Sequence, residues 1–446
     1  MKIAVAGTGY VGLVTGVAMA NIGHNVTCVD VDLEKILLMQ KGISPIYEQG
    51  LEELMKKNSR RLTYTTDYKN AYKDAEIIFI GVGTPEKADG SANLKYVYNV
   101  CDNIAESIEK NCVVVIKSTV PIGTNDNIEK YLRSKIKSNI NISVASNPEF
   151  LAQGTAVRDT LYASRIVVGI EDDYAKKMMA KVYLPFTKEP YNVPYIFMDR
   201  RSAEMVKYAS NDFLALKISY INEISNFCEL IGANIQDVTK GMSFDSRIGN
   251  KFLNSGIGYG GSCFPKDTKA LHWLSKEFDS ELKTVKACID VNNSQKIRLF
   301  YKILNDYGNI NGINIAVLGA TFKPETDDLR EAPSISIINL LLECNVNVFL
   351  YDPVGLENMK KIFNDKIVYC SSIDDAITNK DIAIIVTEWQ QIKDYQVEKF
   401  VELMKEPVLY DGRNCYSIEK LKSLPIHYVS MGRPVINNYQ IKQLNN

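Results

Sequence analysis

The sequence has little of what a metal centre or a disulfide scaffold needs. Its 446 residues include three histidines, and its nine cysteines are scattered without any C-x-x-C spacing. The sequence therefore predicts neither a zinc site nor a disulfide framework, and we expect no bound metal. Free thiols are typical of a reducing compartment, so we expect a cytoplasmic protein.

Long apolar runs and an excess of one charge are missing as well. Apolar runs such as 77–80 are far shorter than the roughly 20 residues that cross a bilayer, which excludes a transmembrane helix. Glycines 7, 9, 12 and 16 interrupt the apolar N-terminal stretch, which argues against a signal peptide. The 52 basic and 53 acidic residues leave a net charge of -1, so no cationic surface is expected to attract nucleic acid. We predict a small-molecule partner.

The N-terminal part of the chain reads as a βαβ unit. A strand at 2–6, a glycine turn at 7–12, a helix to about residue 23 and a strand at 25–30 follow one another. Further apolar runs predict a parallel sheet with crossover helices, in a first domain over residues 1–196. These runs lie at 77–81, 113–117, 142–145 and 166–169.

The middle and end of the chain differ in character. Apolar residues recur at helical spacing over 202–230, which predicts one long helix, and helical sequence continues from Pro265 to about residue 307. We expect a helical and dimerising region over 197–300. The opening pattern then returns, with strands at 313–318 and 346–351, so a second Rossmann-like domain is predicted over 301–446. The predicted class is α/β, with two doubly wound domains joined by a helical region.

A dinucleotide-binding fingerprint opens the chain. Gly7, Gly9 and Gly12 fit G-x-G-x-x-G between a strand and a helix, and Asp30 ends the next strand. This spacing lets the backbone approach a pyrophosphate at the helix N-terminus, while the acid accepts from a ribose 2′-hydroxyl. An acid at that position repels a 2′-phosphate, so the sequence predicts NAD. The second domain lacks the fingerprint, because Thr321 stands where the second glycine should be.

The segment at 256–267 is the most unusual in the chain. Four glycines precede Cys263, and Pro265 starts a helix two residues after it. Glycines make a backbone that can wrap a ligand, and a helix N-terminus next to Lys266 favours a thiolate. We therefore expect Cys263 to be a nucleophile and the other cysteines to be small buried side chains.

Several blocks together resemble the family of nucleotide-sugar dehydrogenases, over nearly the whole chain. Those blocks are GTGYVGL at 7–13, STVP at 118–121, GT at 123–124, NPEFL at 147–151, Lys207 and Asn211, GGSCFPKD at 260–267, FKP at 322–324 and TDDLRE at 326–331. The resemblance implies two successive oxidations of a sugar C6 alcohol, each passing a hydride to NAD, through a thiohemiacetal and a thioester on Cys263. The phenylalanine after Cys263 favours UDP-glucose, while GDP-mannose and a UDP-N-acetylhexosamine stay open.

The resemblance also implies roles for individual residues. Lys207 and Asn211 would stabilise an oxyanion, and their spacing of four places them on one helix face. Asp267 with Thr119 and a water would assist proton transfer, and Glu149 would be the general acid or base. Cofactor contacts would come from Gly7, Gly9, Tyr10, Val11, Gly12, Asp30, Lys35, Thr84, Pro85, Ser118, Thr119 and Arg330.

Contacts to a UDP-sugar follow from the same resemblance. Arg247 would cross to a neighbouring subunit's sugar, which implies a functional homodimer built on the long helix. The other expected substrate residues are Glu149, Phe150, Leu151, Lys207, Asn211, Lys251, Phe252, Leu253, Asn254, Tyr259, Gly260, Phe322, Lys323 and Arg413.

One position departs from the family pattern. Gln153 stands where the family commonly has a second glutamate, and an amide cannot exchange a proton. This favours a competing hypothesis, a protein that binds NAD and a nucleotide sugar without turnover. Cys263, Lys207 and Asp267 argue against it, because they form a chemically complete set.

Overall fold

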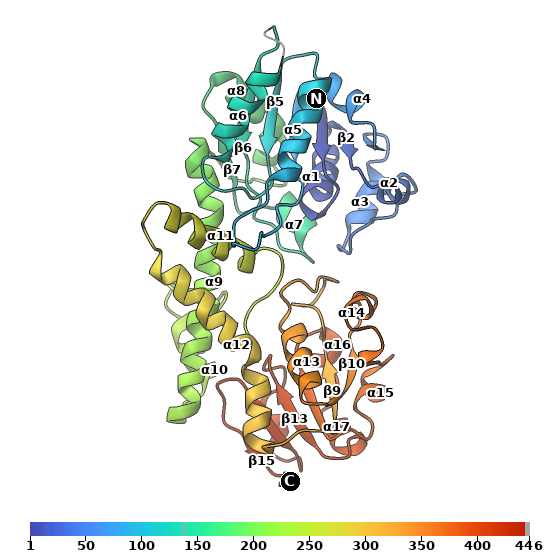
Figure 1. Cartoon of the computed structure of the whole chain (residues 1–446), viewed down its shortest axis with the longest axis vertical. Helices are drawn as coiled ribbons and strands as arrows, with labels where there is room; N and C mark the ends of the chain where they lie inside the picture. Colours follow the sequence, from blue (N-terminus) through green and yellow to red (C-terminus); the bar gives the residue numbers. More distant parts are fainter. Residues whose placement is uncertain (137–138, 442–446) are drawn as a thin grey trace. The chain divides into compact units, whose positions relative to one another are not determined.

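The computed structural model describes residues 1–136 and 139–441, which fold into two compact units. The first unit holds Met1–Ser210 with Lys276–Phe278, and the second holds Asn211–Ser275 and the chain from Asp279 onward. Helix α9 (Arg200–Ile231), drawn in green and labelled in Figure 1, contributes residues to both units. The three domain ranges expected from the sequence therefore stay a prediction.

An eight-stranded sheet forms the core of the first unit. Its strand order is β3-β2-β1-β4-β5-β6-β7-β8, and helices follow most strands (Figure 1). All residues of β4 and β5 are buried, as expected for strands covered by helices on both faces. The strands are β1 (Lys2–Ala6), β2 (Asn25–Val29), β3 (Leu62–Thr65), β4 (Ile77–Ile80), β5 (Cys112–Ile116), β6 (Ile142–Ser146), β7 (Ile166–Gly169) and β8 (Tyr195–Met198).

The direction of β7 corrects the sequence-based expectation of an all-parallel sheet. The first six strands are parallel, but β7 meets β6 in antiparallel fashion at Ser146 and Gly169, and β8 runs parallel to β7. A parallel pair needs a crossover connection, usually a full helix. The connection from β6 to β7 carries only the six-residue helix α7 (Ala156–Leu161), and α7 packs against α1 (Tyr10–Asn21).

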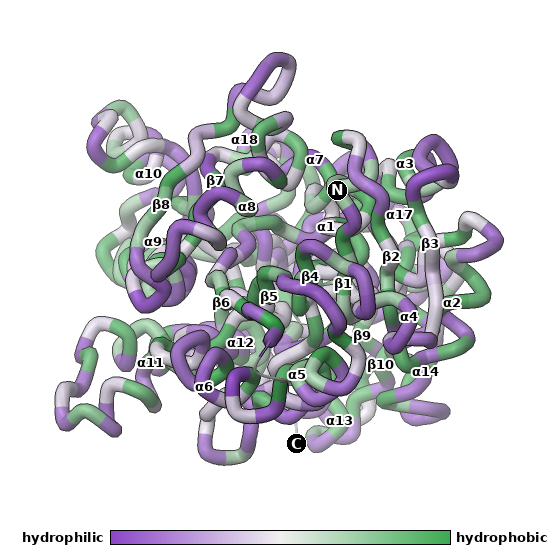
Figure 2. The backbone as a smooth tube through the Cα atoms, turned by 90° about the horizontal axis from the view of Figure 1, so that it is seen from above, coloured by the Kyte–Doolittle hydropathy of each residue, from purple (hydrophilic) through white to green (hydrophobic). Residues whose placement is uncertain are grey.

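Helices of the first unit bury one face and leave the other in solvent. In α6, Ile128 and Leu132 are buried one turn apart, while the charged residues lie outside. Figure 2 shows this change between hydrophobic and hydrophilic residues along α6. The remaining helices of this unit are α2 (Leu33–Gln40), α3 (Leu51–Lys57), α4 (Tyr68–Lys73), α5 (Lys95–Ser107), α6 (Thr124–Lys135) and α8 (Asp173–Tyr183).

The second unit contains a seven-stranded sheet in the order β11-β10-β9-β12-β13-β14-β15. All neighbouring strands are parallel except the edge strand β15, which pairs antiparallel with β14. The return of the opening pattern is confirmed, since β9 and β10 pair as β1 and β2 do. The strands are β9 (Asn314–Leu318), β10 (Asn347–Tyr351), β11 (Val368–Tyr369), β12 (Ile382–Ile385), β13 (Val408–Asp411), β14 (His427–Ser430) and β15 (Ile436–Asn437).

Helices of the second unit confirm and refine the predicted helical region. The long helix expected at 202–230 is α9, and the helical stretch after Pro265 is divided into α11 (Phe264–Glu277) and α12 (Lys283–Tyr307). Among the described residues, no helix is long and apolar enough to cross a bilayer. The other helices are α10 (Ile235–Ser243), α13 (Pro333–Glu343), α14 (Leu356–Phe363), α15 (Ile373–Ile377), α16 (Gln390–Lys393), α17 (Glu398–Leu403) and α18 (Ile418–Leu421).

Candidate active site

The glycine turn between β1 and α1 has the geometry of a dinucleotide loop. Gly7 has a φ of 90°, which favours glycine. A Cβ on Gly12 would lie 2.0 Å from the Gly7 carbonyl oxygen, so the turn can close only around a glycine. A Cβ on Gly9 would meet no atom within 4 Å. The open side of Gly9 is therefore free for the close approach of a pyrophosphate.

Asp30 follows β2 and faces this turn. Its Oδ2 accepts from the backbone nitrogen of Thr8 at 2.7 Å and from the Thr8 hydroxyl at 2.6 Å, and its Oδ1 accepts from the Asp32 nitrogen at 3.0 Å. Burial by itself would raise the pKa of Asp30, but these hydrogen bonds outweigh it and the pKa is lowered. Asp30 is thus a partly exposed anion that can accept from a ribose hydroxyl.

Ser118 and Thr119 lie in the loop after β5. The Ser118 hydroxyl donates to the Val82 carbonyl at 2.6 Å, and the Thr84 hydroxyl donates to the Thr119 carbonyl at 2.8 Å. A small pocket opens beside this loop within the first unit. It is lined by Ser118, Thr119, Val120, Ser146, Pro148, Glu204 and Lys207.

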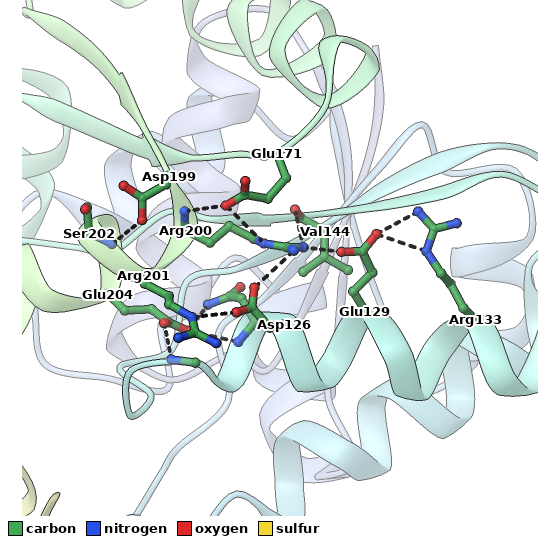
Figure 3. A network of polar contacts seen from close by, with 12 residues as sticks. Asp126, Glu129, Arg133, Val144, Glu171, Asp199, Arg200, Arg201, Ser202 and Glu204 are labelled. Carbon is green, nitrogen blue, oxygen red and sulfur yellow. Dashed lines mark hydrogen bonds and ion pairs between the residues drawn. The ribbon is translucent and has the colours of Figure 1, made fainter. Parts of the chain in front are cut away.

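Glu204 fixes the end of the same loop at the N-terminus of α6. Its carboxylate accepts from the backbone nitrogens of Gly123 at 2.5 Å and Asn125 at 2.9 Å, and burial raises its pKa (Figure 3). Beside it, buried Arg200 forms ion pairs with Glu129 at 2.6 Å and Asp126 at 3.0 Å (Figure 3). These contacts tie the first turns of α9 to α6, so Lys207 and the Thr119 loop are held by one framework.

Glu149 and Lys207 form a buried ion pair. The Lys207 Nζ lies 2.7 Å from Glu149 Oε1, and both side chains are at most 4% exposed. The other Glu149 oxygen accepts from the Leu151 nitrogen at 2.8 Å. Phe150 lies beside them, with Lys207 Nζ 5.8 Å from its ring centroid. Gln153, four residues after Glu149, is also buried.

Lys117 is a site residue that the sequence analysis missed. It is buried at the end of β5, and its Nζ donates to Asn147 Oδ1 at 3.1 Å. Burial is the main cause that lowers the pKa of Lys117 to about 8; the nearby charge of Glu149 opposes this shift, and that of Lys207 adds to it. The sequence offered one signal for this residue, a lysine at the end of an apolar run directly before Ser118. It was overlooked because it was counted as the last residue of the predicted strand.

Cys263 caps α11 in the second unit. The Asp267 nitrogen donates to the Cys263 carbonyl at 2.8 Å, so the thiol stands at the helix N-terminus. Cys263 is partly exposed. A Cβ on Gly261 would lie 2.8 Å from the Phe322 ring, and one on Gly260 would lie 2.4 Å from the Glu331 carbonyl. The glycine pair therefore lets the 322–331 segment pack against the cysteine loop.

Asn211 and Asp267 are joined within the second unit. The Asn211 Nδ2 donates to Asp267 Oδ2 at 2.7 Å, and Lys266 Nζ lies 2.6 Å from Asp267 Oδ1. Asp267 is 1% exposed. The structure thus brings together two predicted pairs, Glu149 with Lys207 in the first unit and Asn211 with Asp267 in the second.

The other expected substrate residues differ in their surroundings. Arg413 donates to the Gly258 carbonyl at 3.0 Å and so supports the glycine loop, while Tyr259 is buried with its hydroxyl 3.4 Å from the Cys288 sulfur. Arg247 is exposed and forms an ion pair with Asp245, two residues earlier, at 2.6 Å. Exposed or partly exposed positions are Lys251, Phe252, Asn254, Phe322 and Lys323, whereas Leu253 is buried.

Expected cofactor contacts likewise divide between the units. Tyr10 and Val11, at the start of α1, and Lys35, in α2, are partly exposed, while Thr84 is buried and Pro85 exposed. Arg330 belongs to the second unit, where it pairs with Asp328 at 2.6 Å. Among the described residues, no group of three or more His, Cys, Asp and Glu side chains could hold a metal ion.

These features define the class of dinucleotide-dependent dehydrogenases: two doubly wound modules, of which one has a complete dinucleotide loop, and a thiol at a helix N-terminus. Family models agree. The NAD binding domain of the UDP-glucose/GDP-mannose dehydrogenase family matches residues 1–187, its central domain matches 201–294, and its UDP binding domain matches 316–418.

Individual relatives extend over nearly the whole chain. UDP-glucose 6-dehydrogenase YwqF of Bacillus subtilis is 47% identical, with 98% of each chain covered. A UDP-glucose 6-dehydrogenase of Rickettsia felis is 45% identical, covering 97% of this chain and 96% of its own. The structure of a UDP-glucose dehydrogenase from Pyrobaculum islandicum has a TM-score of 0.90 at 33% identity, covering 97% and 98%. This chain belongs to the UDP-glucose/GDP-mannose dehydrogenase family, and its cofactor is NAD.

Proposed function

We propose that the protein oxidises UDP-glucose at C6 to UDP-glucuronate, using two NAD and one water. The observation that carries the proposal is the partly exposed Cys263 thiol at the N-terminus of α11, in a chain that matches named UDP-glucose 6-dehydrogenases over nearly its full length. A four-electron oxidation must retain its aldehyde intermediate, and a thiol can do so covalently.

The reaction balances in four steps: a first oxidation, addition of the thiol, a second oxidation and hydrolysis. NAD, when bound at the Gly7–Gly12 turn, supplies the acceptor for one hydride in each oxidation. The C6 alcohol first loses a hydride and a proton and becomes an aldehyde. The Cys263 sulfur adds to this carbon as a thiohemiacetal, which loses a second hydride and proton and becomes a thioester. Water then cleaves the C–S bond, which releases the carboxylate and restores the thiol.

Side chains of both units have proposed roles in these steps. Lys207 and Asn211 stabilise the negative charge that develops on the substrate oxygen. Glu149 acts as general acid or base through water, and its hydrogen bonds to Lys207 and the Leu151 nitrogen hold it in place. Asp267 with Thr119 and a water assists proton transfer. Gln153 contributes hydrogen bonds only, so a single carboxylate in this segment serves the reaction.

Substrate identity is tested with a panel of nucleotide sugars. Purified protein is mixed with NAD and UDP-glucose, GDP-mannose or a UDP-N-acetylhexosamine, and NADH is followed by absorbance. We expect turnover with UDP-glucose and two NADH per uronate formed. Turnover with GDP-mannose alone contradicts the proposal.

The nucleophile is tested with Cys263→Ser. We expect this variant to lose uronate formation while it keeps NAD binding, because the hydroxyl of the introduced serine cannot form a thioester. A variant at buried Cys101, Cys101→Ser, is the matched control and keeps the two-step oxidation. Unchanged turnover in Cys263→Ser excludes the thioester route.

We also propose a homodimer built on α9. Along this helix Phe213, Tyr220 and Phe227 recur every seven residues and are 62%, 51% and 56% exposed, and Leu230 is 81% exposed. Such an apolar stripe on a helix is typical of a face that a partner covers. The exposed Arg247 then reaches the substrate of the partner subunit. The scattered cysteines, without any C-x-x-C spacing, support the cytoplasm as the compartment.

Shared sites are tested by co-expressing Arg247→Ala and Cys263→Ser subunits. If Arg247 acts across the dimer, one site of the mixed dimer has both intact residues and activity returns. If Arg247 acts within its own subunit, every site keeps a defect and the mixture stays inactive.

A further inference from the structure

The segment 255–261 is buried and is neither helix nor strand. A buried backbone outside regular structure must find partners for its N–H and carbonyl groups elsewhere. Main-chain carbonyls accept from two of its nitrogens: Ile257 donates to Gly412 at 3.1 Å, and Gly261 donates to Arg330 at 2.8 Å. Side chains of neighbouring elements bind several of the groups between them.

Helix α12 supplies two buried amides to this segment. Asn292 and Gln295 are three residues apart, so they lie on one face of the helix, and they are 3% and 1% exposed. The Asn292 Oδ1 accepts from the Tyr259 nitrogen at 2.9 Å, and its Nδ2 donates to the Tyr259 carbonyl at 3.1 Å. The Gln295 Nε2 donates to the Gly256 carbonyl at 2.7 Å. Asn292 thus binds both backbone groups of one residue, as a neighbouring strand would.

The surroundings of Asn292 fit this contact. Gly258 has a φ of 81°, and a Cβ on it would lie 2.6 Å from the Asn292 Oδ1. A side chain at position 258 would therefore displace the amide. The Tyr259 hydroxyl lies 3.4 Å from the sulfur of Cys288, one turn before Asn292 on α12. Helix α12 therefore contacts both the backbone and the side chain of Tyr259.

Tyr259 in turn contacts the residue that follows the thiol. Its ring packs edge-on against the ring of Phe264, with centroids 5.8 Å apart. Phe264 comes directly after Cys263 and is the first residue of α11. The contacts from Asn292 through Tyr259 to Phe264 therefore connect α12 with the helix N-terminus at which the thiol stands.

We propose that Asn292 is a positioning residue, which binds both backbone groups of Tyr259 and so holds the cysteine loop, residues 255–263, where the Cys263 thiol can meet the substrate aldehyde. The inference rests on the proposed function for the role of Cys263. Loss of the Asn292 amide leaves the nitrogen and the carbonyl of Tyr259 buried without these partners, which is costly, so the loop shifts to satisfy them. A shift of about 1 Å in a reacting group can lower a rate about a hundredfold.

The first test compares NADH with uronate in Asn292→Ala. A misplaced thiol traps less of the aldehyde, which then leaves after the first oxidation. We expect kcat to fall about tenfold or more, and NADH per uronate, measured by absorbance and chromatography, to rise above two. A change that only lowered stability would reduce the amount of active enzyme and leave this ratio at two. The matched control Asn293→Ala changes the exposed neighbour on α12 and keeps both values.

A second variant, Asn292→Asp, keeps the shape of the side chain. A protonated carboxyl group has an acceptor and a donor and can form both bonds to Tyr259, whereas a carboxylate has no donor for the carbonyl. Burial favours the protonated form, and lower pH favours it further, so the kcat of Asn292→Asp relative to the wild type rises as the pH is lowered from about 8 to about 6. Asn292→Ala cannot form these bonds, and its relative kcat stays low. Equal kcat of the two variants at the lower pH overturns the inference.

Hydrogen–deuterium exchange of the protein without ligands tests the loop without turnover. Asn292→Ala is expected to speed exchange over residues 256–262 by about tenfold or more, and Asn293→Ala to leave it unchanged. If the wild type does not oxidise UDP-glucose but Asn292→Ala still speeds this exchange, the proposed function fails and the holding of the loop by Asn292 stands. Unchanged exchange in Asn292→Ala, or a wild-type kcat with two NADH per uronate in that variant, overturns the inference.

Discussion

The two doubly wound modules begin alike and differ in what their acidic residue does. Gly7 and Gly319 both have a φ near 90°, at 90° and 93°, and Asp30 and Asp352 both follow the second strand of their module. Asp30 is partly exposed and accepts from Thr8 and the Asp32 nitrogen. Asp352 is 2% exposed. Its oxygens accept from the nitrogens of Ala320, Thr321, Val354 and Gly355 and from the Trp389 indole.

The difference teaches that position in the fold does not decide the role of an acid. Groups of the protein itself donate the hydrogen bonds that the Asp352 carboxylate accepts. Asp352 therefore holds the turn together and has little hydrogen-bonding capacity left for a ribose. Asp30 can still accept hydrogen bonds on its exposed side. The glycine turns of the two modules differ in a parallel way: Gly9 leaves open space beside the first turn, whereas Thr321, at the matching position of the second, donates to the Lys323 carbonyl at 3.0 Å. One module is thus suited to a dinucleotide and the other to a different ligand.

Removing the buried acid gives the largest expected effect. Asp352→Ala leaves five donors without their acceptor, so we expect a loss of about 3–5 kcal/mol in the free energy of unfolding. Asp30→Ala removes a partly exposed acid and costs about 1 kcal/mol. Chemical denaturation of both variants measures the difference, and equal losses would remove the distinction between the two acids.

Substitutions at two glycines of the first turn distinguish the effect of packing on stability from the effect of ligand approach on NAD binding. Gly12→Ala places a Cβ against the Gly7 carbonyl, so we expect a loss of about 1–3 kcal/mol in stability and weaker NAD binding. Gly9→Ala meets open space, so the unfolding free energy stays near that of the wild type while KM for NAD rises. A Gly9→Ala protein with wild-type KM would show that no cofactor approaches this turn.

Cofactor choice depends on the charge of Asp30. Asp30→Asn removes the anion and keeps the shape, so we expect KM for NAD to rise about tenfold, as for one lost hydrogen bond to a charged acceptor. The discrimination against NADP falls, because the repulsion of its 2′-phosphate is gone. Steady-state kinetics with both cofactors measure this, and an unchanged NAD to NADP ratio would contradict it.

The smallest expected effect lies in the second module. Lys323→Met keeps the stem and removes the charge, so we expect KM for UDP-glucose to rise by roughly tenfold or less with KM for NAD unchanged. The matched control is Lys422→Met, which removes an exposed lysine of the same unit. A change in the NAD parameter instead would assign Lys323 to the other ligand.

Local sequence patterns predicted much of the fold and the glycine turn of the candidate site. Strands such as β1 and β7 and the glycine turn depend on adjacent residues, so their sequence suffices. The direction of β7 depends on how its connection packs, which no local pattern contains. The short helix α10 has a weak signal because it covers only nine residues.

Long-range contacts explain what was missed. Glu149 and Lys207 are 58 residues apart, and family resemblance, not spacing, brought them together beforehand. The apolar patterns of the strand and the helix did not reveal that Lys117 and Asp212 are buried, because such a pattern does not say which of its charged residues the fold buries. Their burial is a property of neighbouring elements.

Hydrogen–deuterium exchange with each ligand alone tests the division of labour between the modules most directly. NAD is expected to slow exchange at residues 7–12 and leave 319–323 unchanged, while UDP slows exchange at 319–323 and leaves 7–12 unchanged. Protection of 319–323 by NAD together with no change at 7–12 would contradict the account.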